Sequence, residues 1–363
     1  MMTPRRVCID CRMIGASGIG AYLRGLLSGL SDKKPPALEF ALLGRASELI
    51  DQPWDRIEVD APIYSFKEQV AIPRAFGRSK AALLHSPHYN VPLRVASRAI
   101  VTVHDLIHLK FPQYLSSNLA KAYAKFYFHF VIPRTRAILT VSENTKRDLM
   151  EMLRIPAERV TVAYPAISKE FTPQARDLCR RRLAEYQLPE EYLLYVGNLK
   201  ESKNIAFLLE GYRTLKTRRP DLPPLVLVGR NFIPGIEKAL AQNASVRWIG
   251  EMKPESLPSL YAAATLFIFP SLYEGFGLPP LEAMACGAPV LCSDRASLPE
   301  VAGDAAVFFN PESLEDFMAS LERVLQDSSL RRQLRDKGLR RAALFSWDAL
   351  AEKTLSLYSR HLS

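Results

Sequence analysis

Two glutamates, eight positions apart, enclose a stretch with the composition of an anion-binding loop. The segment PSLYEGFGLPPLEAMACGAPV, residues 270–290, places Glu274 before a G-F-G sequence and Glu282 after two prolines. The preceding LFIFPS predicts a buried strand, and PPLEAMACG predicts a short helix with proline in its first turn and Gly287 after its end. The free N–H groups at such a helix start attract anions. Residues 275–278 are therefore a candidate phosphate-binding loop with a carboxylate on each side.

A second glycine-rich turn follows the first predicted strand, in RMIGASGIGAYLRGLL. Gly15, Gly18 and Gly20 allow the backbone to approach a phosphate, and a helix begins there. Their order is G-x-x-G-x-G, whereas dinucleotide-binding folds use G-x-G-x-x-G, and the second strand ends in Gly44 and Arg45 rather than in an acid. This pattern argues against a nicotinamide-dependent dehydrogenase. A plain turn between strand and helix remains the alternative.

Four more side chains with useful chemistry follow predicted strands. His104 and Asp105 stand at the end of the apolar strand in IVTVHDLIHLKFP, and Lys200 and Lys203 follow the strand in YVGNLKESKN. A lysine just past a strand end can supply a point charge to a phosphate. Each residue also has a simpler interpretation, as a structural histidine or as a solvated loop lysine.

Short apolar strands alternate with helical segments along the whole chain. The strand candidates are RRVCIDCRMI, EFALLG, AALLHSP, RAIVTVHDL, RAILTVS, YLLYVGN, PPLVLVGR, SVRWIG, the end of SLYAAATLFIFPS, and APVLCSD. We therefore expect an α/β protein with two Rossmann-like domains, whose parallel sheets face a central cleft and bind ligands beyond the carboxyl ends of their strands. The expected parts are residues 1–168, residues 169–345, and a helix over residues 346–363. That helix is expected to begin with Ser346 as its N-cap and to pack back toward the first domain.

The charge of the chain is unevenly distributed. At 363 residues it is long enough for two cores. Residues 1–170 contain 24 Lys and Arg against 15 Asp and Glu, whereas residues 171–363 contain 24 against 23. Between residues 61 and 142, 11 basic residues accompany only Glu68 and Asp105. Such a field attracts phosphate-bearing substrates, anionic lipid surfaces or nucleic acid.

The N-terminus and the cysteines predict a cytoplasmic protein. MMTPRRVCIDCRM leads into a strand without the apolar segment of a signal peptide, and no uncharged apolar run of 18 residues occurs. Cys8 and Cys11 form a C-x-x-C only within a strand, where positions three apart point to opposite faces. We interpret them as buried small residues rather than as a redox or metal-binding pair.

An aromatic and basic segment, NLAKAYAKFYFHFVIPR, occupies residues 118–134. At helical spacing, one stripe consists of Tyr123, Phe126, Tyr127 and Phe130. We expect this stripe to pack into the core of the first domain, while Phe128 falls outside it. With the surrounding basic excess, the segment predicts charge-driven contact with an anionic membrane.

These motifs together resemble glycosyltransferase family 4, the retaining nucleotide-sugar enzymes with the two-domain GT-B fold. The matching segments are SGIGAYLRGL, VTVHDL, LTVSENTKRDL, YVGNLKESKN, VGR, VRWIGEMKPESLPSLYAAA, FPSLYEGFGLPPLEAMACGAPVLCSD and LPEVAGDAAVFFNP. They run along almost the whole chain, and the last two are highly specific. Within the family, the sequence is most similar to the mannosyltransferase-like branch that builds O-antigen and other polysaccharides.

The resemblance implies roles for individual residues. Glu282 would bind the ribose hydroxyls, Glu274 would hold hydroxyls of the transferred sugar, Lys203 would bind the diphosphate, and His104 would lie beside the sugar near the reacting carbon. The implied catalytic residues are His104, Lys203 and Glu274. The implied donor-binding residues are Gly18, Gly20, Asn198, Lys203, Arg230, Gly250, Met252, Gly275, Phe276, Gly277, Leu278 and Glu282. Asp105 and His108 are expected on the acceptor side.

The resemblance also implies the reaction. A hexose, with mannose from GDP-mannose as the expected donor, would pass with retention to a glycan or a lipid-linked glycan at the cytoplasmic membrane face. Positive charge grows on the sugar while the nucleoside diphosphate leaves, and a lysine with backbone amides can neutralise the leaving group. No D-x-D sequence occurs, so no cofactor and no obligatory metal are expected. No protein nucleophile is evident, which disfavours double displacement.

Three other functions remain open at this point. Close relatives often read GTLEPRKN where this chain reads GNLKESKN, so Ser202 replaces an arginine that donates two hydrogen bonds to phosphate. A catalytically weak scaffold that binds nucleotide sugars is therefore one alternative. A nucleotide-sugar epimerase of the same shape is another. A nucleic-acid-binding protein would explain the charge, but the sequence carries no recognised binding motif, so no nucleic-acid partner is expected.

Overall fold

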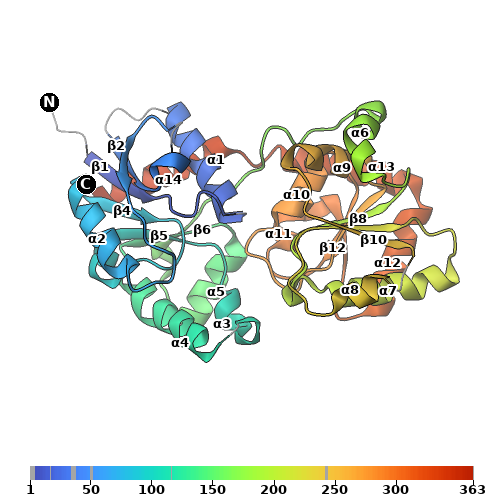
Figure 1. Ribbon diagram of the computed structural model, residues 1–363, viewed down its shortest axis with the longest axis horizontal. Coiled ribbons are helices and arrows are strands. Elements are labelled where there is room, and N and C mark those ends of the chain that lie inside the picture. Colours follow the sequence, from blue (N-terminus) through green and yellow to red (C-terminus); the bar gives the residue numbers. More distant parts are fainter. Residues whose placement is uncertain are drawn as a thin grey trace. The chain divides into compact units, whose positions relative to one another are not determined.

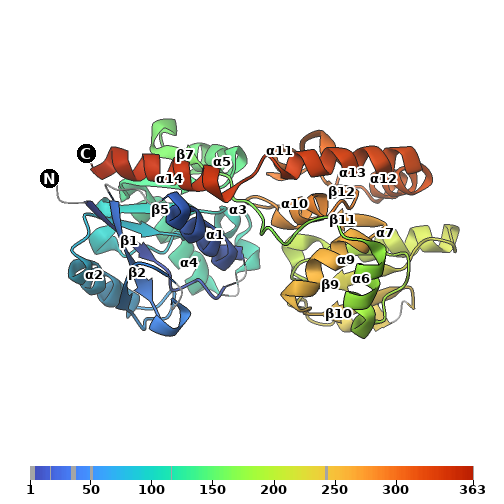
Figure 2. The same cartoon turned by 90° about the horizontal axis from the view of Figure 1, so that it is seen from above.

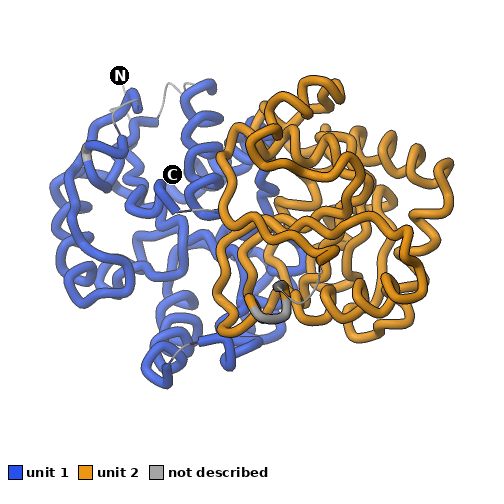
Figure 3. The backbone as a smooth tube through the Cα atoms, turned by 45° about the vertical axis from the view of Figure 1, so that its right-hand side comes forward, with its two compact units in different colours: residues 1–166, 346–363 blue, residues 167–345 orange. Residues whose placement is uncertain are grey.

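The computed structural model describes residues 5–16, 18–33, 38–49, 52–115, 117–241 and 244–362. The chain divides into two compact units, which are coloured separately in Figure 3. Unit 1 contains residues 1–166 and 346–363, and unit 2 contains residues 167–345. Each unit has one sheet in which all paired strands are parallel. The predicted fold class, two α/β units with parallel sheets, is confirmed.

Unit 1 has a seven-stranded sheet in the order β3-β2-β1-β4-β5-β6-β7 (Figure 1). Its strands are β1 (Arg5–Asp10), β2 (Leu38–Gly44), β3 (Asp55–Glu58), β4 (Leu83–Ser86), β5 (Ala99–Val103), β6 (Ala137–Thr140) and β7 (Val160–Val162). Most of them are buried on both faces, as parallel strands covered by helices require. The strand order reverses direction between β1 and β4, where a doubly wound sheet opens a crevice beyond its strand ends.

The helices of unit 1 connect these strands. They are α1 (Gly18–Lys33), α2 (Glu68–Ser79), α3 (Ile107–Lys110), α4 (Asn118–Phe126) and α5 (Glu143–Leu153), and the chain returns to the unit with α14 (Trp347–Leu362). Ser346 caps α14 as expected, because its Oγ accepts a hydrogen bond from the Ala349 N–H at 3.1 Å.

Helix α14 packs directly on α1, as Figure 2 shows. A Cβ built on Gly25 would lie 2.3 Å from the Trp347 ring, so the ring occupies the space above this glycine. Behind it, the His85 ring binds the Tyr358 hydroxyl and, at 2.8 Å, Thr102 Oγ1. Thr102 is also 3.2 Å from the Tyr22 hydroxyl. This buried polar chain connects α14, β4, β5 and α1.

Unit 2 has a six-stranded sheet in the order β10-β9-β8-β11-β12-β13. Its strands are β8 (Leu193–Val196), β9 (Leu225–Val228), β10 (Val246–Gly250), β11 (Leu266–Phe269), β12 (Val290–Ser293) and β13 (Ala306–Phe309). Its helices are α6 (Arg176–Leu183), α7 (Ile205–Arg218), α8 (Ile236–Ala241), α9 (Leu257–Ala263), α10 (Leu278–Ala285), α11 (Leu298–Ala302), α12 (Leu314–Gln326) and α13 (Ser328–Ala342). Here the order reverses between β8 and β11.

The structure corrects the expectation for the aromatic segment. Helix α4 is followed by a π-helical turn, η4 (Tyr127–Val131), which rotates the later side chains away from regular helical spacing. Tyr127 and Phe128 are buried, whereas Phe126 and Phe130 are exposed and stack on each other with ring centroids 5.7 Å apart. The predicted stripe is therefore wrong at Phe126 and Phe130, and Phe128 belongs to the core. The five cysteines are free and buried.

Candidate active site

The strongest candidate site in unit 2 lies at the reversal between β8 and β11. Lys203 ends the short helical turn η8 (Glu201–Lys203) after β8, and Glu274 lies in the loop after β11. The Lys203 Nζ donates to Glu274 Oε1 in an ion pair, and both side chains are mostly shielded from solvent. Nζ also lies 5.7 Å from the centre of the Phe269 ring. Two residues predicted separately from sequence are therefore direct partners.

The loop after Glu274 has a fixed backbone. Gly277 has a φ of +109°, and a Cβ there would lie only 2.8 Å from Leu298. The Ser297 Oγ is 3.0 Å from the Glu274 carbonyl and 2.7 Å from the Phe276 carbonyl, so it holds the loop from outside. Only glycine adopts this conformation without strain and also fits the space. The loop leads straight into α10, whose first turn contains two prolines.

Glu282 lies inside α10 and binds one neighbour strongly. The Tyr261 hydroxyl donates to Glu282 Oε2 at 2.8 Å. Burial disfavours the charged carboxylate and raises the pKa of Glu282 to about 7, although the Tyr261 hydrogen bond acts in the opposite direction. The protonated form is therefore favoured here relative to a solvent-exposed glutamate. A partly buried carboxylate that gains hydrogen-bond partners on binding suits a ligand with neighbouring hydroxyls.

The remaining predicted residues of unit 2 follow the ends of adjacent strands. Asn198 comes after β8, Arg230 after β9, and Gly250 and Met252 at and after the end of β10. Hydrogen bonds join these ends: the Leu199 N–H donates to the Arg230 carbonyl at 2.8 Å. Gly250 has a φ of +79°. The exposed Arg230 lies 3.8 Å from Glu251. The structure therefore brings the predicted set of unit 2 to one edge of its sheet.

Ser202, which replaces an arginine of the family, is held through hydrogen bonds to its backbone. Ser202 is buried, and its carbonyl accepts hydrogen bonds from the Leu272 N–H at 3.0 Å and from Ser271 Oγ at 3.2 Å. The Lys200 side chain does not point toward Glu274, because its Nζ lies 5.1 Å from the centre of the Phe232 ring. Lys203 is the lysine that reaches Glu274.

In unit 1, the predicted residues follow β1 and β5. Gly18 begins α1, and a Cβ on Gly20 would lie 2.4 Å from the Ile14 carbonyl oxygen, so this turn requires glycine for close approach. Asp105 Oδ1 accepts the Ile107 N–H at 3.0 Å, and His108 Nδ1 lies 2.9 Å from the Tyr89 hydroxyl. Asp105 thus accepts a hydrogen bond from the first residue of α3, whereas His108 belongs to a group of aromatic side chains.

His104 is held as a neutral ring. Its Nε2 donates to the Pro87 carbonyl at 2.8 Å, and the Tyr22 ring packs edge-on at 4.9 Å between centroids. Burial lowers its pKa below the ordinary value, despite the opposing effects of the Pro87 carbonyl and Asp105. Because the proton sits on Nε2, a lone pair remains on Nδ1. The ring can therefore accept a hydrogen bond or a proton there at neutral pH.

Several residues that hold these loops belong to no motif that predicts a role for them. Ser271, Ser293 and Ser297 are fully buried, and each reaches a carbonyl of a site loop or of its neighbour. In unit 1, Glu68 is fully buried and binds Arg12, although it appeared in the sequence only as one of two acids in a basic stretch. The one local hint is a serine near a strand end, two residues after β11 in FPS and at the last position of β12 in CSD.

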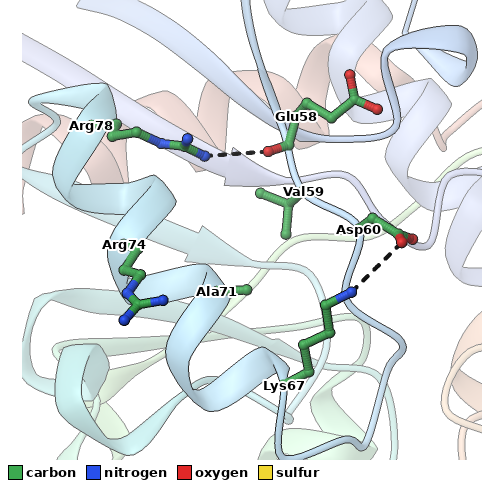
Figure 4. Close-up of a pocket in the computed structure, with 7 residues that line it drawn as sticks. All are labelled: Glu58, Val59, Asp60, Lys67, Ala71, Arg74 and Arg78. Carbon is green, nitrogen blue, oxygen red and sulfur yellow. Dashed lines mark hydrogen bonds and ion pairs between the residues drawn. The ribbon is translucent and has the colours of Figure 1, made fainter.

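A cavity of about 530 Å³ lies elsewhere, between the end of β3 and one face of α2 (Figure 4). Its lining residues are Glu58, Val59, Asp60, Lys67, Ala71, Arg74 and Arg78. Lys67 Nζ lies 3.6 Å from Asp60, and Arg78 donates to the Glu58 carbonyl at 3.3 Å. None of the predicted site residues lines this cavity.

Neither a metal-binding cluster nor a membrane-spanning helix occurs among the described residues. Among them, no three or more His, Cys, Asp and Glu side chains gather in a way that could hold a metal ion. Within the same ranges, none of the helices combines the length and the apolar character needed to cross a membrane.

Comparison with known proteins assigns the chain to a family. The model "Glycosyl transferases group 1" matches residues 182–341, and the model "Glycosyltransferase Family 4" matches residues 43–171. The O-antigen chain mannosyltransferase B of Escherichia coli is 35% identical over 285 residues, which cover 77% of this chain and 74% of that protein. The chain belongs to glycosyltransferase family 4. It is therefore a hexosyltransferase.

Other similarities support the same assignment of family and fold. A serotype-specific mannosyltransferase of Escherichia coli is 31% identical over 292 residues, but the match spans 77% of this chain and only 36% of that protein. Sucrose-phosphate synthase from Thermosynechococcus elongatus superimposes with a TM-score of 0.78 at 20% identity, covering 98% of both chains. HepE of Anabaena, solved with UDP and glucose, superimposes with a TM-score of 0.74 at 15% identity. The match covers 98% of this family 4 chain and 100% of the HepE chain. The fold is GT-B.

Proposed function

We propose that this family 4 enzyme transfers a mannosyl group from GDP-mannose, with retention, to a glycan or lipid-linked glycan. The observation that carries the proposal is the edge of the unit 2 sheet. There, the Lys203–Glu274 ion pair, the Gly275–Leu278 loop and Glu282 follow one another around the start of α10. The similarity to O-antigen mannosyltransferases supports mannose as the sugar.

Lys203 and the loop amides are proposed to bind the diphosphate. As the bond between sugar C1 and the diphosphate oxygen breaks, negative charge builds on the leaving group, and the positive charge of Lys203 stabilises it. The acceptor hydroxyl oxygen forms the new bond to C1 on the same face, and its proton passes to a diphosphate oxygen. Glu274 is proposed to bind sugar hydroxyls and Glu282 the ribose. UDP bound to the structurally similar HepE supports a nucleoside diphosphate in this fold.

The two catalytic proposals in unit 1 rest on His104 and the α1 glycines. A neutral His104 with a lone pair on Nδ1 can accept a hydrogen bond from a hydroxyl of the transferred sugar. Gly18 and Gly20 are proposed to approach the diphosphate through their backbone. Asp105 and His108 are proposed on the acceptor side. No cofactor and no obligatory metal are proposed, and transfer in the presence of excess chelator tests that point.

A panel of nucleotide sugars tests the donor. GDP-mannose, UDP-glucose, UDP-galactose and UDP-N-acetylglucosamine are each added to the protein, and melting temperature and release of the nucleoside diphosphate are measured. A donor that binds the folded protein raises its melting temperature. GDP-mannose is expected to give the largest shift and the fastest release. A larger response to a UDP-sugar would overturn the donor assignment, and NMR of the product anomer tests retention.

The main alternative is a scaffold that binds donor without transferring it. Ser202 motivates this alternative, because its buried place between the β8 and β11 loops leaves no guanidinium there. A thermal shift with GDP-mannose but no product over many hours would favour the scaffold. Interconversion of sugar nucleotides without any acceptor would instead favour an epimerase.

We also propose that the protein acts in the cytoplasm and that unit 1 contacts an anionic membrane through α4 and η4. Leu119 is 80% exposed, and the stacked Phe126 and Phe130 project from the same segment. Lys125 and Arg134 are exposed among them. Apolar rings that enter the interface and cations that meet anionic headgroups both favour adsorption, at about 1 kcal/mol per basic residue at the surface.

Vesicle co-sedimentation tests this contact. The protein is expected to pellet with vesicles of phosphatidylglycerol but not of phosphatidylcholine, and to be released at 1 M salt, where the Debye length is about 3 Å. Phe126→Ser with Phe130→Ser should weaken pelleting, while Leu344→Ser, an exposed leucine of unit 2, serves as the control. Protein that stays in the supernatant with phosphatidylglycerol at low salt would overturn the proposal.

A further inference from the structure

A continuous chain of hydrogen bonds in unit 1 joins an exposed tyrosine to a buried ion pair. The Tyr64 hydroxyl lies 3.4 Å from His88 Nε2, and His88 Nδ1 donates to Asn90 Oδ1 at 3.1 Å. Asn90 Nδ2 donates to Glu68 Oε2 at 3.0 Å, and Arg12 donates to the same carboxylate at 3.2 Å. Arg12 lies in the loop after β1, Tyr64 after β3, and His88 and Asn90 after β4, while Glu68 begins α2.

The buried end of this chain is rigid and charged. Glu68 is fully buried, and Arg12 also donates to Asp10 Oδ2 at 2.7 Å. Tyr123 contributes a further hydroxyl to Glu68 at 3.3 Å. Buried charges are costly unless they are paired and hydrogen-bonded, so the removal of one partner would leave an uncompensated charge and destabilise the protein. This network therefore fixes the positions of His88 and Tyr123 beneath Tyr64.

The exposed end is an aromatic cluster, defined here as Tyr64, His88, Tyr89 and Tyr123. The Tyr64 ring centroid lies 5.8 Å from that of His88, 6.1 Å from that of Tyr89 and 5.6 Å from that of Tyr123. Tyr64 is 46% exposed, so part of its side chain is accessible to a ligand from solvent. Burial lowers the pKa of His88 to about 3, so its ring stays neutral at physiological pH.

Tyr64 also has a strained backbone. Its φ of +64° places a bulky residue in the left-handed region, where glycine would be more stable. Such strain persists where surrounding contacts hold it, and it is common at ligand sites. Here the Tyr64 side chain is 46% exposed, and its contacts with His88 and Tyr123 connect it to the buried Glu68.

The position of the cluster in the fold is that of a ligand site. The network begins at Asp10, at the end of β1, and includes Asn90, which follows β4. The strand order of unit 1 reverses between these two strands, and ligands of doubly wound sheets bind there. Polar groups fixed around a half-exposed aromatic surface suit a neutral ligand that has both apolar and hydroxyl-rich faces.

We propose that Tyr64, with His88 and Tyr123, is a platform that binds a pyranose ring of the acceptor glycan. The C–H face of a hexose is apolar and slightly positive, so it matches the negative face of a tyrosine ring. Hydroxyls at the rim of the sugar would bond to the Tyr64 and Tyr123 hydroxyls. The inference rests on the proposed function, because it takes the acceptor to be a glycan, and it assigns residues to that acceptor.

The test uses α-linked mannotriose as the probe and the full chain. Its dissociation constant is measured by NMR titration without donor, and its KM at saturating GDP-mannose. Tyr64→Ala is expected to raise both constants tenfold or more, whereas Tyr64→Phe should change them less than about threefold. The donor dissociation constant should be unchanged in both variants. Phe66→Ala is the matched control, because Phe66 is 93% exposed and lies two residues from Tyr64.

The outcomes separate this inference from the proposed function. If Tyr64→Ala binds mannotriose as tightly as the native chain, or if no trisaccharide binds while GDP-mannose is turned over, the platform is refuted and the transferase stands. If maltotriose binds in place of mannotriose and still depends on Tyr64, the platform is supported and the acceptor assignment is wrong. An equal loss of donor affinity in Tyr64→Ala would show a general structural effect and would also refute the platform.

Discussion

The two glutamates around α10 have different environments, and their substitutions should differ accordingly. Glu282 meets Tyr261, and Glu274 meets Lys203. Glu282→Ala is expected to weaken donor binding by about 1.5–3 kcal/mol, the size of a charged hydrogen-bond partner. Glu274→Ala is expected to lower kcat more than donor affinity, because its proposed partner is the sugar that changes charge. Calorimetry measures the donor affinity of each variant, and steady-state kinetics measure its kcat. If both variants lost donor affinity equally and kept their kcat, the separate roles of the two glutamates would be contradicted.

Lys203 should matter more than its neighbour Lys200. Lys203→Ala is expected to reduce transfer at least a hundredfold while melting temperature changes little, because the lysine opposes charge on the leaving diphosphate. Lys200→Ala is the matched control, since its Nζ lies against the Phe232 ring rather than at Glu274. Single-turnover rates measure the effect. A damaging Lys200→Ala with a harmless Lys203→Ala would show that the roles are assigned to the wrong lysine.

The pKa of Glu282 makes donor binding sensitive to pH. With a pKa of about 7, the carboxylate that can accept two ribose hydrogen bonds is fully formed only above that pH. Donor affinity is therefore expected to rise between pH 6 and pH 8, and Glu282→Gln should bind more weakly and lose most of this dependence. Calorimetric titrations across this range measure it. A native profile that is flat, or that falls with pH, would contradict this environment for Glu282.

At the scale of helices and strands, local sequence predicts the central strands and α10, but not the features that depend on distant contacts. Apolar runs marked the central strands, and a double proline with a later glycine marked α10, because local chemistry determines these features. The edge strands β3 (DRIE) and β7 (VTV) were not predicted, since three of the four residues of DRIE are charged and VTV has only three residues. β13 (AVFF) was also not predicted, although it is as long and as apolar as the central strands. The ion pair of Arg12 with Glu68 joins positions 56 apart, and no local pattern records it. The π turn after α4 likewise depends on packing.

The contact between α1 and α14 gives a prediction for two glycines. Gly25→Ala is expected to destabilise the protein by about 1–3 kcal/mol, because the new Cβ would meet the Trp347 ring at 2.3 Å and overpacking exceeds the gain in helix propensity. Gly77→Ala in α2 is the control. A Cβ there meets nothing within 4 Å, so it should stabilise the protein by about 0.5–1 kcal/mol. Urea unfolding measures both, and similar changes in the two variants would contradict this packing.

At the scale of the whole molecule, the two units contain groups whose pKa values are shifted in opposite directions. Histidine pKa values are lowered in unit 1, and a glutamate pKa is raised in unit 2. All six histidines lie in unit 1. Burial lowers the pKa of His85 and His88 to about 3, and it lowers that of His104 and of His361 as well. In unit 2, the carboxyl of Glu282 has its pKa raised from 4.5 to about 7. For the fully buried His85, the shift couples stability to pH by up to about 1.4 kcal/mol per pH unit, whereas the more exposed His361 contributes less because solvent screens it.

Acidification from pH 7 to pH 5 should therefore weaken unit 1 and strengthen unit 2. Below pH 6.5 the histidines of the unfolded chain bind protons, whereas the buried histidines of the folded unit do not, so unit 1 loses stability. The raised pKa of Glu68 acts in the opposite direction. Between pH 4.5 and pH 7 the folded Glu282 holds a proton that the unfolded chain has released, so unit 2 gains stability as pH falls. Hydrogen exchange, corrected for its intrinsic pH dependence and read by mass spectrometry, resolves the units. Glu282→Gln should remove the gain in unit 2, and equal losses of protection in both units would refute the coupling.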